Sequence, residues 1–189
     1  MSGLILLGSM LVVFIYGVML YNGLVNLKHG VARAWANIDV LLKQRHDEIP
    51  KLVEVCRQYQ QFEQGTLERV IAARSRVSSA REQQDMPALG KAEADLRAGV
   101  GQIFAVAEAY PELKTNEQFM QLQNRISGLE NAIADRREFY NDEVNINNVR
   151  VEQFPDVLIA NMFHFEQKPL LEFSVTEKTD VDMKTLFAS

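Results

Sequence analysis

The first 27 residues of the chain contain no Asp, Glu, Lys, Arg or His. A cleaved secretory signal needs a basic stretch before its apolar run and a small-residue cleavage site after it, and the sequence has neither. A helix from Leu4 to about Tyr21 would be roughly 27 Å long, which approaches the hydrocarbon thickness of a bilayer. We therefore expect residues 1–27 to form an uncleaved, single-pass transmembrane anchor.

Cysteine is almost absent. Cys56 is the only one, so the sequence offers no disulfide framework, and no earlier cysteine could carry a lipid anchor. It lies alone on an apolar helix face, where a small core residue is expected, and its scarcity suits a reducing compartment. Lys28 and Arg33 follow the apolar run and no basic residue precedes it, so the positive-inside rule predicts an amino terminus outside and residues 28–189 in the cytoplasm.

Motifs that carry chemistry are also missing. None of the three histidines has a Glu three positions before it, as the di-iron sites of helical bundles require. The sequence has no Gly-rich phosphate loop, no G-x-S-x-G and no zinc-ligand spacing. We therefore expect no enzymatic activity, no cofactor and no metal. The formal net charge of −5 also argues against a nucleic-acid partner, because such proteins carry an overall basic face.

What the sequence does contain is helical periodicity. Apolar residues recur at spacings of three and four between the prolines, which is typical of amphipathic helices. The fold class predicted is all-α, with the amino-terminal transmembrane helix continuing into an antiparallel cytoplasmic bundle of four helices over residues 28–155. A short amphipathic segment and an irregular tail should follow over residues 156–189. The expected helices cover about 28–47, 50–82, 87–109 and 116–154.

Two helix boundaries carry specific expectations. Around Pro50 the chain either stops and restarts, with Asp47 as a cap, or continues as one helix with a proline kink. Thr115 and Gln118 form a capping box that should open the last long helix. The spacing of about 3.5 in that helix favours shallow, coiled-coil-like packing.

Several polar residues fall on or beside the apolar stripes. Burial of such groups is costly unless they pair, so we expect an internal network in which Glu63 meets an arginine of the last long helix. A network of this kind could fix helix register, or it could line a binding pocket. Its expected members are Glu63, Glu130, Arg136, Arg137 and Asn141.

Basic residues form a second candidate cluster. If the chain turns at Pro50, the arginines of the second expected helix return toward the bilayer, where anionic lipid would attract them. The alternative is a solvated helix face whose arginines have i,i+4 partners. The members of this cluster are Lys28, Arg33, Arg69, Arg74, Arg76 and Arg81.

Four stretches of the chain resemble the LemA family of bacterial membrane proteins. The resemblance covers roughly residues 21–165, and the elements AWANID, RHDEIP, YPELK and FYN are specific to it. It implies a single amino-terminal span and a helical cytoplasmic domain. By analogy with a relative associated with building an organelle membrane, it also implies a role in membrane organisation. The stretches are YNGLVNLKHGVARAWANIDVLLKQRHDEIPKLVE (Tyr21–Glu54), TLERVIAARS (Thr66–Ser75), AYPELKTNEQFMQLQNRISGLENAIADRREFYNDEVNINN (Ala109–Asn148) and QFP (Gln153–Pro155).

Two functional hypotheses follow. The first is a non-enzymatic, membrane-anchored scaffold that contacts lipid and acts by self-association as a homo-oligomer or by recruiting a protein partner, thereby organising or remodelling the membrane. The alternative is a sensor or accessory subunit of a membrane enzyme such as a protease, with a small-molecule pocket near Glu63 and Arg137.

Overall fold

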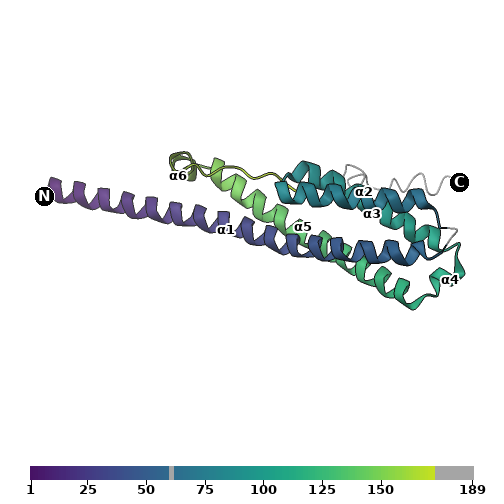
Figure 1. Cartoon of the computed structure of the whole chain (residues 1–189). Coiled ribbons are helices and arrows are strands. Elements are labelled where there is room, and N and C mark those ends of the chain that lie inside the picture. The colour runs from purple at the N-terminus through teal and green to yellow at the C-terminus, as the bar shows by residue number, and fades with distance from the viewer. Residues whose placement is uncertain (60–61, 173–189) are drawn as a thin grey trace, which may run out of the picture. The chain divides into compact units, whose positions relative to one another are not determined.

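The computed structural model describes residues 1–59 and 62–172. This part of the chain is helical and contains no strand (Figure 1), which confirms the all-α class. The irregular tail predicted beyond residue 169 lies mostly outside the described residues. The six helices are α1 (Ser2–Arg57), α2 (Gln64–Gln83), α3 (Met86–Ala107), α4 (Pro111–Lys114), α5 (Glu117–Glu152) and α6 (Asp156–Phe163).

The chain forms two compact units. Among the described residues, unit 1 contains 1–38 and 135–170, and unit 2 contains 39–134 and 171–172. Helices α1 and α5 therefore each contribute to both units. This division differs from the boundaries at residues 27 and 155 that the sequence suggested.

Helix α1 passes through Pro50 and ends only at Arg57. The predicted helix end at residue 47 is therefore wrong, and Asp47 lies inside the helix and caps nothing. Proline lacks the N–H that would bond the carbonyl of His46, four residues earlier. The Nε of Arg74, from α2, donates a hydrogen bond of 2.9 Å to that carbonyl oxygen. The freed acceptor is thus satisfied by a neighbouring helix, and α1 can continue.

Helix α2 starts at Gln64 and not at residue 50, so the second expected helix was too long at its amino end. At the other end, Gln84 adopts a left-handed conformation, with φ of 53°, and closes α2. Asp85 then caps α3 by accepting a 3.0 Å hydrogen bond from the backbone N–H of Ala88. This two-residue connection makes α2 and α3 an antiparallel pair, which lie side by side in Figure 1.

Unit 2 is an up-down-up-down bundle of four long helical segments. Asp39 and His46 of α1 contact Arg81 and Arg74 of α2, so residue numbers rise in one helix as they fall in the other. Tyr59 meets Asn116 at the start of α5, which makes α5 antiparallel to α1 as well. The core is apolar and buried, and its largest enclosed side chains include Ile49, Leu52, Leu89, Leu96, Ile103, Leu113, Phe119 and Ile126.

The start of α5 differs by one residue from the predicted capping box. The Thr115 backbone N–H and hydroxyl bond the Pro111 carbonyl and complete the short turn of α4. Asn116 therefore takes the capping position, and its side-chain oxygen accepts a 3.0 Å bond from the Phe119 N–H. Because α4 occupies Thr115, the fourth expected helix begins at Glu117.

Unit 1 pairs the first part of α1 with the second part of α5. Trp35 and Tyr140 meet edge to face with ring centroids 6.1 Å apart, and Leu24 and Val144 are completely buried. Helix α6 follows α5 and lies against α1, where the rings of Tyr21 and Phe163 are 4.7 Å apart. The short amphipathic segment expected after residue 155 is therefore a helix.

After α6 the chain returns along α5 as an extended strap, residues 164–170. Asn147, which is buried, donates to the Glu166 carbonyl at 3.3 Å, and Asn148 both donates to and accepts from Lys168. The Tyr140 hydroxyl donates to the Pro169 carbonyl at 3.1 Å. Asparagine side chains thus satisfy a backbone that has no helical partner of its own.

Candidate functional site

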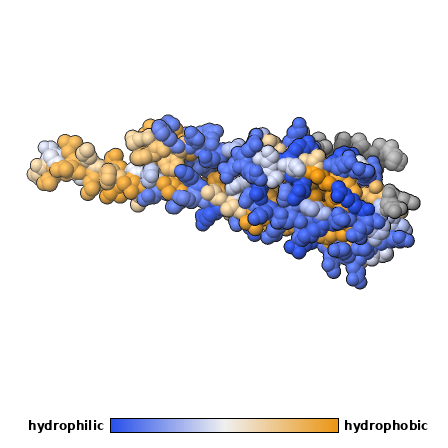
Figure 2. Space-filling view, viewed as in Figure 1, coloured by the Kyte–Doolittle hydropathy of each residue, from blue (hydrophilic) through white to orange (hydrophobic). Residues whose placement is uncertain are grey.

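The amino-terminal part of α1 is the most unusual surface of the chain. Its large apolar side chains from Leu4 to Met19 are exposed, and no charged residue lies among them. Figure 2 shows this apolar surface along the first part of the helix. Among the described residues one helix, α1, is long and apolar enough to cross a membrane. A core helix of a soluble protein would meet the same length criterion, but its apolar window would be buried, whereas here none of it is.

Helix α6 extends this apolar surface. A groove lined by Phe14, Val18 and Tyr21 of α1 and by Ile159 and Met162 of α6 is about 340 Å³ in volume and has an apolar lining. In Figure 2 the apolar colouring continues from α1 onto α6. Unit 1 thus presents apolar groups from two helices on the same surface.

Unit 2 has a charged group in its interior. Arg45 of α1 and Glu93 of α3 form an ion pair, and their side chains are only 3% and 1% exposed. Glu130 of α5 lies close to both, and Arg97 of α3 adds a second cation. Burial raises the pKa of Glu130 above its ordinary value, and the two arginines only partly offset this effect. Among the described residues, the Arg45 Nε and one oxygen of each of the two glutamates have no hydrogen-bond partner.

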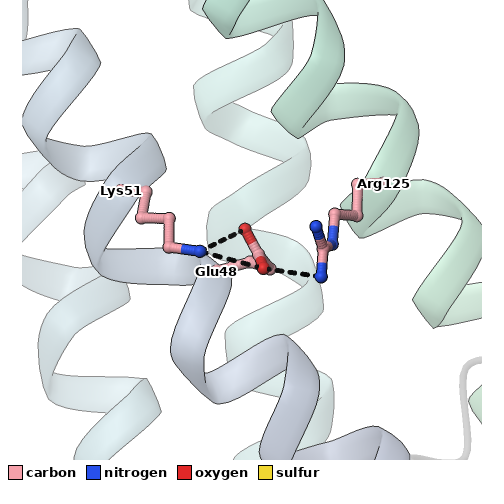
Figure 3. Close-up of polar contacts among 3 residues, drawn as sticks. All are labelled: Glu48, Lys51 and Arg125. Carbon is pink, nitrogen blue, oxygen red and sulfur yellow. Dashed lines mark hydrogen bonds and ion pairs between the residues drawn. The ribbon is translucent and has the colours of Figure 1, made fainter.

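A second buried carboxylate, Glu48, borders an open groove between α1 and α5. Its oxygens lie 3.1 Å from Lys51 Nζ and 3.1 Å from Arg125, as Figure 3 shows. Both cations are more than half exposed, while the glutamate side chain is 5% exposed. The groove has a volume of about 620 Å³, and Glu54 and Gln121 also line it. The opposing charges balance, so the groove favours neither an anion nor a cation.

Two members of the predicted polar network, Glu63 and Glu130, lie in unit 2. Glu130 is half-buried among charged partners, as expected. Glu63 is exposed and pairs locally, with Thr66 at 2.9 Å and Arg69 at 4.0 Å, so its placement in the core was wrong. Its position before the first turn of α2 explains this, because the expected helix had no break there.

The remaining members lie in unit 1. Arg136 is exposed, so its place in a buried network was wrong, whereas Arg137 and Asn141 are half-buried and each has a partner. Glu63 and Arg136 belong to different units. The partners that Glu63 has within unit 2 are Thr66 and Arg69 of α2.

The predicted basic cluster divides between the units. Lys28 and Arg33 are exposed on α1 in unit 1. The four α2 arginines have partners inside unit 2, but the i,i+4 spacing expected for a solvated face is found for Arg69, whereas the other three pair with α1 or α3. Arg69 bonds Gly65 and Thr66, Arg74 bonds His46, Arg76 lies 3.1 Å from Asp95, and Arg81 lies 3.4 Å from Asp39.

Sequence reasoning missed Arg45, Glu48 and Glu93, although a signal was present. Arg45 lies three residues after the buried Leu42 and four before the buried Ile49, and Glu93 lies four after Leu89. Each charge therefore sits on a core stripe. The helix end expected at residue 47 hid the first stripe, because it made Arg45 a terminal residue.

Metal ligands and reactive thiols were sought among the described residues. Among them no group of three His, Cys, Asp or Glu side chains could hold a metal ion. Cys56 is buried in the core, as predicted, and burial raises the pKa of its thiol to about 12. Such a thiol is a poor nucleophile at neutral pH.

A comparison with known families identifies relatives of the chain. The LemA family model matches residues 34–185, which is most of the chain. The chain belongs to the LemA family. It is also similar to "Protein LemA" of Metamycoplasma hominis, with 25% identity over 166 residues that cover 87% of this chain and 74% of that protein. LemA proteins are associated with membranes, and the apolar start of α1 precedes the matched region.

Proposed function

We propose that this LemA protein is a non-enzymatic scaffold, anchored by one span at the bacterial inner membrane and acting by self-association or partner recruitment to organise the membrane. The observation that carries the proposal is the exposed, charge-free surface of α1 between Leu4 and Met19. Water would not stabilise about 16 exposed residues of this kind, whereas a bilayer would. The same helix continues to Arg57 inside the bundle.

The proposed orientation places the amino terminus outside and both units on the cytoplasmic side. Lys28 and Arg33 follow the span on α1 and are exposed, which supports this direction. An impermeant maleimide applied to intact cells tests it. Ser2→Cys should be labelled from outside, and Ser79→Cys, at an exposed site on α2, only after lysis. The parent chain is the control, because its one thiol is buried. Labelling of Ser79→Cys in intact cells would contradict the proposed orientation and indicate the opposite one.

Anchoring is tested by adding charge to the proposed span. Leu11→Arg with Val12→Arg costs about 2.5–3.5 kcal/mol of insertion free energy for each arginine at the centre of a span. The variant should move from carbonate-washed membranes to the soluble fraction. Ser75→Arg with Ser79→Arg, on the exposed side of α2, is the matched control and should remain in the membrane. Equal retention of both variants would contradict an α1 anchor.

Self-association or partner recruitment is tested in cells. A lysine-reactive cross-linker applied to cells that express the full chain should trap either a second copy or a stoichiometric partner. The double-arginine variant, which lacks the anchor, is the control for contacts that depend on the membrane. A chain that runs only as an uncross-linked monomer would contradict the scaffold.

The groove beside Glu48 supports the alternative of a sensor or accessory subunit of a membrane enzyme such as a protease. Its volume of about 620 Å³ falls in the range of small-molecule sites. The expected pocket near Glu63 and Arg137 is not where this groove lies. Gln121→Ala would weaken a ligand bound there, whereas it would leave a purely structural scaffold unchanged.

A further inference from the structure

Helix α6 leaves large apolar side chains exposed at its surface. Leu158 and Met162, one helical turn apart, are 58% and 69% exposed, and Phe154, in the turn before the helix, is 77% exposed. Phe163 at the end of α6 is also more than half exposed. Four such residues within ten positions are more than a scatter of surface apolar groups.

The charge of α6 is directed away from this surface. Asp156 is the only charged residue of the helix, and it is buried. One of its carboxylate oxygens accepts hydrogen bonds from Arg150, at 2.9 Å from Nε and 2.6 Å from a terminal nitrogen. Paired in this way, the carboxylate does not oppose contact between the exposed side of α6 and an apolar phase.

The position of α6 along α1 fixes the depth it would reach. Its carboxyl half lies beside α1 residues from Phe14 to Tyr21, where Tyr21 and Phe163 meet edge to face. Seven residues of helix cover about 10 Å, and amphipathic helices lie about 5–10 Å into the boundary between headgroups and acyl chains. The end of the proposed span and α6 therefore lie at the same level.

Cationic groups are present next to this level. Lys28 and Lys168 line a second cavity with Phe163, Phe165 and Glu166, at the end of α6. In a lipid leaflet the anionic phosphates lie directly above the apolar acyl chains. Cations beside an apolar protein surface can contact both layers at once.

We propose that α6 is a second membrane contact, an interfacial helix whose Phe154, Leu158, Met162 and Phe163 enter the leaflet where α1 leaves the bilayer. This inference rests on the proposed function, because it requires α1 to span the membrane. The occupant is a lipid surface, with the apolar side chains in the acyl region and Lys28 and Lys168 at the phosphates. The chain would then hold the bilayer at two points, and this would limit how unit 1 tilts about α1.

Fluorescence quenching in vesicles of phosphatidylglycerol and phosphatidylethanolamine tests the proposal on the full chain. An environment-sensitive dye is attached to one of three exposed positions: Leu11→Cys in the span, Met162→Cys on α6, or Asp142→Cys on the polar surface of α5. The buried Cys56 remains unlabelled, as the parent chain will show. Quenchers are placed near the top of the acyl chain, deep in it, or in water as iodide.

The proposal predicts that the dye at Met162 is quenched most by the shallow lipid quencher, and several-fold less by iodide than the dye at Asp142. Leu158→Asp in the same reporter protein should reverse this preference, with the helical circular dichroism unchanged. If iodide quenches Met162 and Asp142 equally, α6 faces water and the proposal is wrong. If neither lipid quencher nor iodide reaches Met162, protein covers α6 and the proposal is equally wrong. The dye at Leu11 distinguishes failure of the two proposals. If the deep quencher does not act at Leu11, α1 is not a membrane anchor. If it acts at Leu11 but no lipid quencher acts at Met162, only the proposed role of α6 is wrong.

Discussion

Arg45→Met should destabilise unit 2 more than any substitution of a surface arginine. The Arg45 and Glu93 side chains are almost inaccessible, and Glu130 lies close to the same guanidinium. Methionine keeps much of the apolar stem but removes the charge, so Glu93 becomes a buried carboxylate without its ion-pair partner. Removal of one member of a buried pair costs about 3–5 kcal/mol. The free energy of unfolding of unit 2 should fall by this amount.

Urea titration of the full chain in detergent, followed by the helical circular dichroism signal, measures the change. Arg76→Met is the matched control, because its partner Asp95 and Arg76 itself are about half exposed, and such pairs contribute about 0.2–1 kcal/mol. The double variant Arg45→Met with Glu93→Leu removes both charges and should recover most of the lost stability. If Arg45→Met shifts the transition no further than Arg76→Met does, the reasoning about a buried charge pair is refuted.

Three further predictions concern the bundle. Burial raises the pKa of Glu130 above its ordinary 4.5, so the folded chain retains a proton that the unfolded chain releases. The free energy of unfolding should therefore fall as pH rises from about 4.5 through the raised pKa. Urea titrations at several pH values should show a smaller fall for Glu130→Gln, and an equal dependence on pH in the two proteins would contradict the prediction. Gly90→Ala should lower the urea midpoint, because a Cβ there would overlap the Glu172 carbonyl oxygen, whereas Gly101→Ala, in open space on the same helix, should raise it slightly. Cys56 should react with a maleimide only after urea unfolds the bundle, because burial raises the pKa of its thiol to about 12 and excludes the reagent; rapid labelling of the native chain would contradict its place in the core.

Periodicity predicted the elements of this fold, because a helical stripe depends only on residues three and four apart. The carboxyl ends of α2, α3 and α5 lie within two residues of the predicted ends. The effect of Pro50 was harder to predict, since the neighbouring residues do not determine whether a helix continues through it. The answer depends on Arg74, which is 28 positions beyond His46. Its side chain donates to the His46 carbonyl in place of the N–H that proline lacks. No local pattern contains that information.

The candidate site was predicted less well, for a related reason. Glu63 and Arg136 were placed in the core by their spacing from apolar neighbours, but α2 begins only after Glu63, and Arg136 faces solvent. Arg45 and Glu93 occupy core stripes, yet each stripe on its own contains only an isolated charge. Only the packing of α1 against α3 shows that the two opposite charges form an ion pair. Pairing across helices is a tertiary property.

The mass of the intact protein tests the proposed scaffold most directly. The full chain, purified in mild detergent, is measured by light scattering with the detergent contribution removed. The scaffold predicts a particle that contains two or more copies of the 21.5 kDa chain, or one copy with a stoichiometric partner. A strict monomer, with no partner retained after cross-linking in cells, would contradict the account.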